Sequence, residues 1–193
     1  LTYDPSTKSI VDINKPIPAY SGRKVPIDIM PRLLSKYNGN KAFEAHLQMY
    51  ITQNVGRGTD KSLDAALGIC KSTVEWIGNE VSCGVGMQRI DVMLSVVENP
   101  TKRVVMPIEL KAVPAYEDNT RQLARYVDWI EQYYLPNRIS IIQPVLICRK
   151  GAPLSSTLKR KFDDFNNRTG ILPLKYIEFD VITGTLIFKK ISY

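Results

Sequence analysis

The chain is poor in cysteine, in histidine and in long apolar runs. Its 193 residues include 3 cysteines and 1 histidine. Cys70, Cys83 and Cys148 are odd in number, and their spacing is that of neither a disulfide framework nor a CxxC metal or redox pair. We interpret the lone His46 as structural or solvated. A reducing, cytoplasmic setting is therefore expected.

Membrane and secretory features are also missing from the sequence. No apolar run reaches the length of about 18 residues that spans a bilayer, and the chain does not open on a recognisable signal peptide. We therefore expect no membrane partner. The length suits one compact α/β domain with a modest arm, or a domain cut from a longer protein.

Positive charge is in surplus. The formal net charge is +7 and the sequence pI is about 9.3. A surplus of this size attracts polyanions, chiefly nucleic acid or anionic lipid. The same charge also serves solubility alone, so it indicates a class of partner without deciding it.

Proline frequency divides the chain into an arm and a domain. Five prolines fall within residues 1–40, and prolines this frequent break regular elements. We therefore predict an N-terminal arm or linker over 1–40 and a single domain over 41–193. Part of the arm, residues 24–30, could add an extended piece to a sheet edge.

Alternating helical and strand patterns predict an α/β domain with a central mixed β-sheet flanked by helices. Apolar spacing indicates helices over 41–54, 119–134 and 155–166, and a short helix or loop over 61–70. Strand patterns cover 73–77, 80–84, 88–97, 103–113, 139–148, 174–182 and 185–192. The 88–97 and 103–113 strands form a hairpin that carries Asp91 on one arm and Glu109 on the other.

Two acidic residues in this hairpin suggest metal-dependent chemistry. Asp91 and Glu109 both sit in otherwise apolar strands, where an unpaired carboxylate is costly to bury. Mg²⁺ prefers oxygen ligands, usually one or two carboxylates with water and substrate phosphate. Lys111 lies two residues after Glu109 and so on the same strand face, where it could contact an attacking water or stabilise developing charge. The carbonyl oxygen of Leu110 is available as a further ligand.

A Glu-x-Lys sequence alone is also common as a solvent-facing ion pair, so neighbouring residues carry weight. Glu44 on the first helix could reach a metal ion through water, or lie on a solvated face. Gln122 and Tyr126 are four residues apart on one helix face. They could orient Lys111 or hold a DNA phosphate, or could be ordinary surface residues.

In order and spacing, these residues resemble the PD-(D/E)XK nuclease superfamily. The pattern is Glu44, then Arg89-Ile90-Asp91, Ile108-Glu109-Leu110-Lys111 and Gln122-x-x-x-Tyr126. The last motif resembles the QxxxY motif of the RecB-like branch. The stretch from Glu80 to Tyr126 is most similar to the catalytic domain of archaeal and actinobacterial EndoMS/NucS mismatch endonucleases. The resemblance covers about residues 43–148 and implies a restriction-endonuclease-like core.

The resemblance implies a DNA endonuclease, dependent on Mg²⁺ or Mn²⁺, that works inside the cell. In this hypothesis Asp91, Glu109 and the Leu110 carbonyl bind the metal, Lys111 acts on water or on the transition state, and Glu44, Gln122 and Tyr126 assist. The predicted DNA-binding residues are basic: Arg89, Arg121, Arg125, Lys159, Arg160 and Lys161.

Several alternatives stay open. The enzyme could serve mismatch repair or act as a type II-like restriction endonuclease. The chain could instead be a non-catalytic nucleic-acid-binding module on the same fold, or an interaction domain whose charge recruits a protein. A homodimer is one assembly that the sequence leaves open.

Overall fold

The computed structural model describes residues 2–4, 6–11, 27–84, 88–99, 101–135 and 140–193. Two strands near the N-terminus, β1 (Thr2–Asp4) and β2 (Ser9–Val11), pair with each other antiparallel. The helices are α1 (Met30–Asn38), α2 (Glu44–Asn54), α3 (Lys61–Leu67), α4 (Asp118–Trp129) and α5 (Ser156–Asn166). The large sheet contains β3 (Thr73–Ser82), β4 (Arg89–Asn99), β5 (Lys102–Lys111), β6 (Ile141–Ile142), β7 (Val145–Arg149), β8 (Lys175–Ile182) and β9 (Thr185–Lys190).

This seven-stranded sheet is mixed. Its strand order is β3-β4-β5-β7-β8-β9, with β6 pairing with β5. The β5–β7 and β7–β8 pairs are parallel, whereas β3–β4, β4–β5 and β8–β9 are antiparallel. The predicted α/β class with a central mixed sheet is therefore confirmed. The single strand predicted over 139–148 is two short strands among the described residues, β6 and β7, and β7 lies between β5 and β8.

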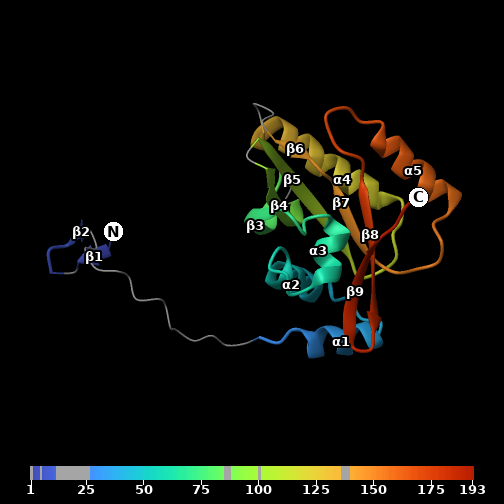
Figure 1. The fold of residues 1–193 in the computed structure, drawn as a ribbon, viewed down its shortest axis with the longest axis horizontal. Coiled ribbons are helices and arrows are strands. Elements are labelled where there is room, and N and C mark those ends of the chain that lie inside the picture. The colour runs from blue at the N-terminus through green and yellow to red at the C-terminus, as the bar shows by residue number, and fades with distance from the viewer. Residues whose placement is uncertain (1, 5, 12–26, 85–87, 100, 136–139) are drawn as a thin grey trace.

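Helices cover both faces of the sheet and form two cores (Figure 1). On one face, buried side chains of α1, α2 and α3 pack against Val92, Leu94, Ile108 and other strand residues. On the opposite face, Leu123 and other residues of α4 and α5 pack against strands that include β4 and β7. Side chains alternate between the faces along a strand, so β4, β5, β7 and β8 each contribute to both cores.

Helix α1 falls within residues 1–40, where we predicted an arm. Its Leu33 is fully buried, and Ile29 just before it is 4% exposed; both belong to the α2-side core. Pro31 occupies the first turn of α1, where a missing backbone N–H costs nothing. The part of the predicted arm from Ile29 onward therefore packs with the body of the domain. The earlier prolines Pro5, Pro16, Pro18 and Pro26 lie outside the described residues.

Most other elements match their predicted ranges. The helix predicted over 119–134 ends as an α-helix at Trp129 and continues as one π-helical turn, η1 (Ile130–Tyr134). The two strands predicted over 73–77 and 80–84 are one strand, β3, in which Glu80 adopts a φ of 49°. The closing hairpin turns at Thr183 and Gly184, both at positive φ, as a two-residue turn between twisted strands requires.

No helix among the described residues is both long and apolar enough to cross a membrane.

Candidate active site at the point where two strands separate

The paired strands β4 and β5 part at the positions of the two predicted metal ligands. Their regular antiparallel pairing continues as far as Val92 opposite Ile108. One residue further, the same register would place Asp91 opposite Glu109. There the backbone N–H of Leu110 donates to Asp91 Oδ2 at 2.7 Å instead of to a backbone carbonyl. The Asp91 side chain therefore stands between the strands at the point where they separate.

Asp91 is a partly buried carboxylate with another acid beside it. Burial, together with the negative charge of Glu109, raises the pKa of Asp91 to about 7. The Leu110 N–H and the charge of Lys111 act in the opposite direction but do not cancel this rise. The two acids therefore lie close enough to repel each other, as a pair of ligands for one cation would.

Glu109 is buried to 1% exposure and both of its carboxylate oxygens have partners. Lys111 Nζ lies 2.5 Å from Oε1, and the Tyr126 hydroxyl lies 2.7 Å from Oε2. The Tyr126 oxygen is also 2.7 Å from the carbonyl oxygen of Arg89, so its single proton can be donated to either acceptor. Tyr126 thereby links α4 to both strands of the site.

The ionisation states of these partners follow from their surroundings. Burial alone would lower the pKa of Lys111, but the ion pair with Glu109 outweighs it and the pKa is raised. Burial and the charge of Glu109 raise the pKa of the Tyr126 hydroxyl. At neutral pH, therefore, Lys111 is a cation and Tyr126 a neutral donor.

Helix α2 contributes to the site with residues that lie on one helix face. Glu44 Oε1 accepts from the backbone N–H of Ala112, just beyond Lys111, at 3.2 Å. Gln48, one turn later, donates from Nε2 to the Asp91 carbonyl oxygen at 2.5 Å and to Glu80 Oε1 at 3.2 Å. The sequence prediction included Glu44 but missed Gln48 and the role of Glu80. The four-residue spacing of Glu44 and Gln48 was a signal that could have found Gln48.

The other predicted site residues are placed less centrally. Gln122 is partly buried on α4, one turn before Tyr126, and its side chain makes no hydrogen bond with any described residue. Arg89 forms a 3.4 Å ion pair with Glu80, and Arg121 a 3.2 Å pair with Asp118. Arg125 is exposed on α4. Three more basic residues are exposed on α5: Lys159, Arg160 and Lys161.

The donors at the site are of a kind that suits a hard cation. The described residues contain no cluster of three or more His, Cys, Asp and Glu side chains arranged to hold a metal ion. Asp91 and Glu109 supply two carboxylates, with the Leu110 carbonyl between Glu109 and Lys111 in the chain. Such an oxygen-only set fits Mg²⁺ or Mn²⁺, which keep several waters, better than a thiophilic ion.

Comparison of the chain with protein-family models, with curated protein sequences and with solved structures gives no match.

Proposed function

We propose that this protein is a metal-dependent DNA endonuclease with a restriction-endonuclease-like core. One observation carries the proposal: Asp91 and Glu109 meet where β4 and β5 separate, with Lys111 bound to Glu109. Two adjacent carboxylates, one of them almost fully buried, are costly unless positive charge offsets both, and Lys111 forms its ion pair with Glu109 only. A nearby lysine adds positive charge where a phosphate would gain negative charge.

In this proposal Asp91, Glu109 and the Leu110 carbonyl hold Mg²⁺ or Mn²⁺. A bound divalent ion would neutralise phosphate charge and lower the pKa of a water nucleophile. Lys111 contributes a positive charge beside the attacked phosphate. Tyr126 keeps the Glu109 carboxylate oriented, and Glu44 and Gln48 fix the ends of the two strands that carry the ligands.

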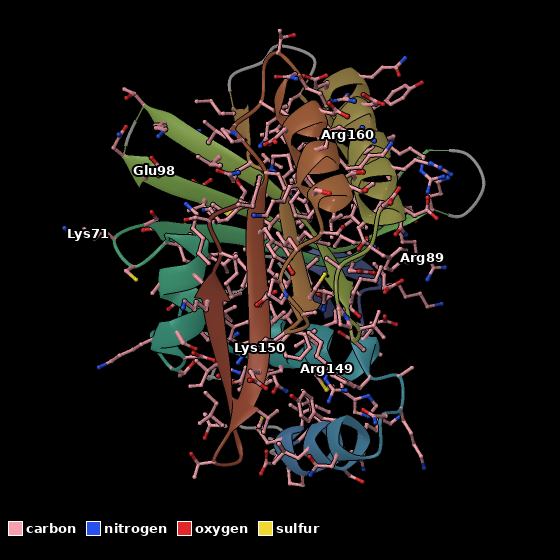
Figure 2. The ribbon with its side chains drawn as sticks, turned by 90° about the vertical axis from the view of Figure 1, so that its right-hand side faces the viewer. Lys71, Arg89, Glu98, Arg149, Lys150 and Arg160 are labelled. Carbon is pink, nitrogen blue, oxygen red and sulfur yellow. The ribbon has the colours of Figure 1, made fainter. Side chains whose placement is uncertain are left out.

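The test is DNA cleavage with and without Mg²⁺, on supercoiled, single-stranded, flapped and mismatched substrates. The wild type should cleave only with the metal. Asp91→Ala should abolish cleavage, and Lys111→Ala should lower the rate by about 10²–10³, the typical cost of one such electrostatic contact. Lys71→Ala is the matched control, because Lys71 is exposed in the turn before β3 and has no ion pair with a described residue (Figure 2).

Two outcomes would defeat this function. Wild-type rates in both Asp91→Ala and Lys111→Ala would place any activity elsewhere. Metal-dependent DNA binding by a wild-type protein that cleaves none of the four substrates would favour a non-catalytic binding module. Preference among the four DNA structures would separate a structure- or mismatch-specific repair enzyme from a restriction-type enzyme.

A further inference from the structure

A cleft opens directly beyond the end of β5, the strand that carries Glu109 and Lys111. It has a volume of about 460 Å³ and begins at Glu44 and Ala112, which are hydrogen-bonded to each other. It lies at the carboxyl ends of the parallel strands β5 and β7, a common position for ligand sites in α/β sheets. The remaining lining residues are Asn40, Lys41, Ala42, Val113, Pro114, Arg149 and Lys150.

Arg149 is held in this cleft by two neutral partners. Its guanidinium carbon lies 3.9 Å from the centre of the Tyr37 ring, and its Nη1 donates to Asn40 Oδ1 at 2.9 Å. No acidic group among the described residues forms an ion pair with it. The guanidinium is therefore fixed in place, and among the described residues it has no ion-pair partner and most of its donors are unused.

Tyr37 is itself positioned by a second layer of contacts. Its hydroxyl donates to Asp180 Oδ1 at 2.7 Å, and Lys150 Nζ lies 3.2 Å from Asp180 Oδ2. The Tyr37 hydrogen bond and the Lys150 contact lower the pKa of Asp180, so it accepts as a carboxylate at neutral pH. Asp180 thereby fixes the ring under Arg149 while its own charge is offset by Lys150.

The cleft walls bring this arrangement beside the catalytic strand. The Arg149 backbone N–H donates to the Val113 carbonyl oxygen at 3.2 Å, which joins the end of β7 to the segment after Lys111. A Cβ added at Gly151 would lie 2.7 Å from Pro114 Cβ. The segment after Lys111 therefore packs closely against the chain that follows β7. Figure 2 shows Arg149 and Lys150 together between the sheet and α1, far from Arg160 on α5.

We propose that Arg149, with Lys41 and Lys150, binds a phosphodiester group of the DNA strand that is cut at Asp91 and Glu109. This phosphodiester is a neighbour of the one that is cut. A planar guanidinium recognises phosphate through two parallel hydrogen bonds, and a fixed one loses little freedom on binding. Three cations line the cleft with one carboxylate, Glu44, which is already bound to a backbone N–H. Lys150 also contacts Asp180, so the positive charge that remains available comes mainly from Arg149 and Lys41. The inference rests on the proposed function, because the ligand of the cleft is the same DNA strand that the proposed active site cuts.

The experiment measures binding of a fluorescein-labelled 20-base-pair duplex, and of one of its strands alone, by anisotropy in Ca²⁺. Arg149→Ala should weaken binding about tenfold and reduce the slope of log affinity against log salt by about 1. Arg149→Lys keeps the charge but loses the planar fork, and should stay at least about threefold weaker than the wild type. Arg57→Ala is the control, because Arg57 is an exposed arginine in the loop after α2. The DNA affinity of this variant should stay within about twofold of the wild-type affinity.

A Tyr37 variant tests whether binding depends on the position in which the Tyr37 ring holds Arg149, and not on positive charge alone. Tyr37→Leu should weaken binding in the wild type but add nothing in Arg149→Ala, since it acts only through the guanidinium. Unfolding midpoints of all variants identify any that lose stability. Equal losses from Tyr37→Leu in both backgrounds would overturn the arrangement.

The result that overturns the proposal is Arg149→Ala binding DNA as tightly as Arg57→Ala. An Arg149-dependent affinity for poly-L-glutamate without one for DNA would overturn it too, since the cleft would then take acidic protein. Cleavage assays on the same variants separate the two proposals. A wild type that binds DNA through Arg149 but never cleaves defeats the catalytic function alone, whereas cleavage without any Arg149 effect defeats only this site.

Discussion

The partly buried carboxylate of Asp91 destabilises the folded protein when it is charged. Its pKa of about 7 lies above the ordinary value of 3.8 for an aspartate, because of burial and the charge of Glu109. Between these two values the folded protein binds more protons than the unfolded chain. Stability therefore falls as pH rises through this window, and the penalty is fully present above pH 7. A bound cation would relieve this cost, because it offsets the charge of both acids.

Asp91→Asn is therefore predicted to stabilise the metal-free protein. The amide oxygen can still accept from the Leu110 N–H, but the buried charge is gone. At pH 8 the free energy of unfolding should rise by on the order of 1–2 kcal/mol after allowance for solvent screening. The gain should shrink at pH 5, where the wild-type carboxyl is mostly protonated.

Urea denaturation in EDTA at both pH values measures this gain. Asp163→Asn, on the exposed face of α5, is the control and should show no comparable pH-dependent gain. Added Mg²⁺ should stabilise the wild type and not Asp91→Asn, since only the wild type retains both carboxylates. A wild type more stable than the variant at pH 8 without metal would show that the charge is already compensated.

Helix α4 and strand β5 meet at the Tyr126 hydroxyl. The ring is buried in the α4-side core, while the hydroxyl reaches Glu109 and the Arg89 carbonyl. Oriented carboxylates bind metal more tightly, and loss of a contact that orients a ligand typically costs about 10–100-fold in affinity or activity. Tyr126→Phe should therefore raise the Mg²⁺ concentration needed for half-maximal cleavage by about tenfold.

Tyr176→Phe is a matched control for this prediction. Tyr176 is also buried, and its hydroxyl donates to the carboxylate of Glu178 at 2.8 Å, on β8 rather than at the site. Both substitutions remove one buried hydroxyl that is bound to an acid. A shift in Mg²⁺ dependence of the same size in both variants would mean that lost stability, not ligand orientation, causes the effect.

Local sequence patterns predicted the elements better than the contacts between them. The periodic stripes of α2, α4 and α5 and the alternation in β4 and β5 arise within single elements, so the sequence reveals them. The break in β3 was also visible, because Gly78-Asn79 separated two predicted strands. It was interpreted as a strand end, whereas the chain continues past Glu80 in a left-handed conformation.

The contacts missed by sequence reasoning join residues distant in the chain. Gln48 reaches the Asp91 carbonyl across 43 residues, and Tyr37 reaches Asp180 across 143. Neither side chain is unusual in its own helix, so its local pattern indicates only a helical surface. The prolines that suggested an arm over 1–40 also concealed α1, because Pro31 suits the first turn of a helix.

Across the whole molecule, the cations that we propose to contact DNA lie in two regions, one at the end of β7 and one on α5. Arg149 and Lys150 lie at the end of β7 beside α1, whereas Arg160 lies on α5 toward the opposite end of the view (Figure 2). Lys159, Arg160 and Lys161 are exposed and form no ion pairs with described residues. A duplex that contacts both regions must therefore extend along the molecule.

Duplex length should thus decide whether the α5 cations matter. We predict that Lys159→Ala, Arg160→Ala and Lys161→Ala together weaken binding of a duplex of about 30 base pairs and lower its salt slope by about 2–3, since each lost phosphate contact removes about 0.9. A duplex of about 8 base pairs, roughly 27 Å long at 3.4 Å per base pair, should bind the triple variant and the wild type alike. Arg149→Ala should weaken the binding of duplexes of both lengths.

Anisotropy titrations at several salt concentrations in Ca²⁺ measure these affinities. Equal binding of the long duplex by the triple variant and the wild type would show that the α5 cations face solvent only, and would confine the DNA to the site at β5 and β7.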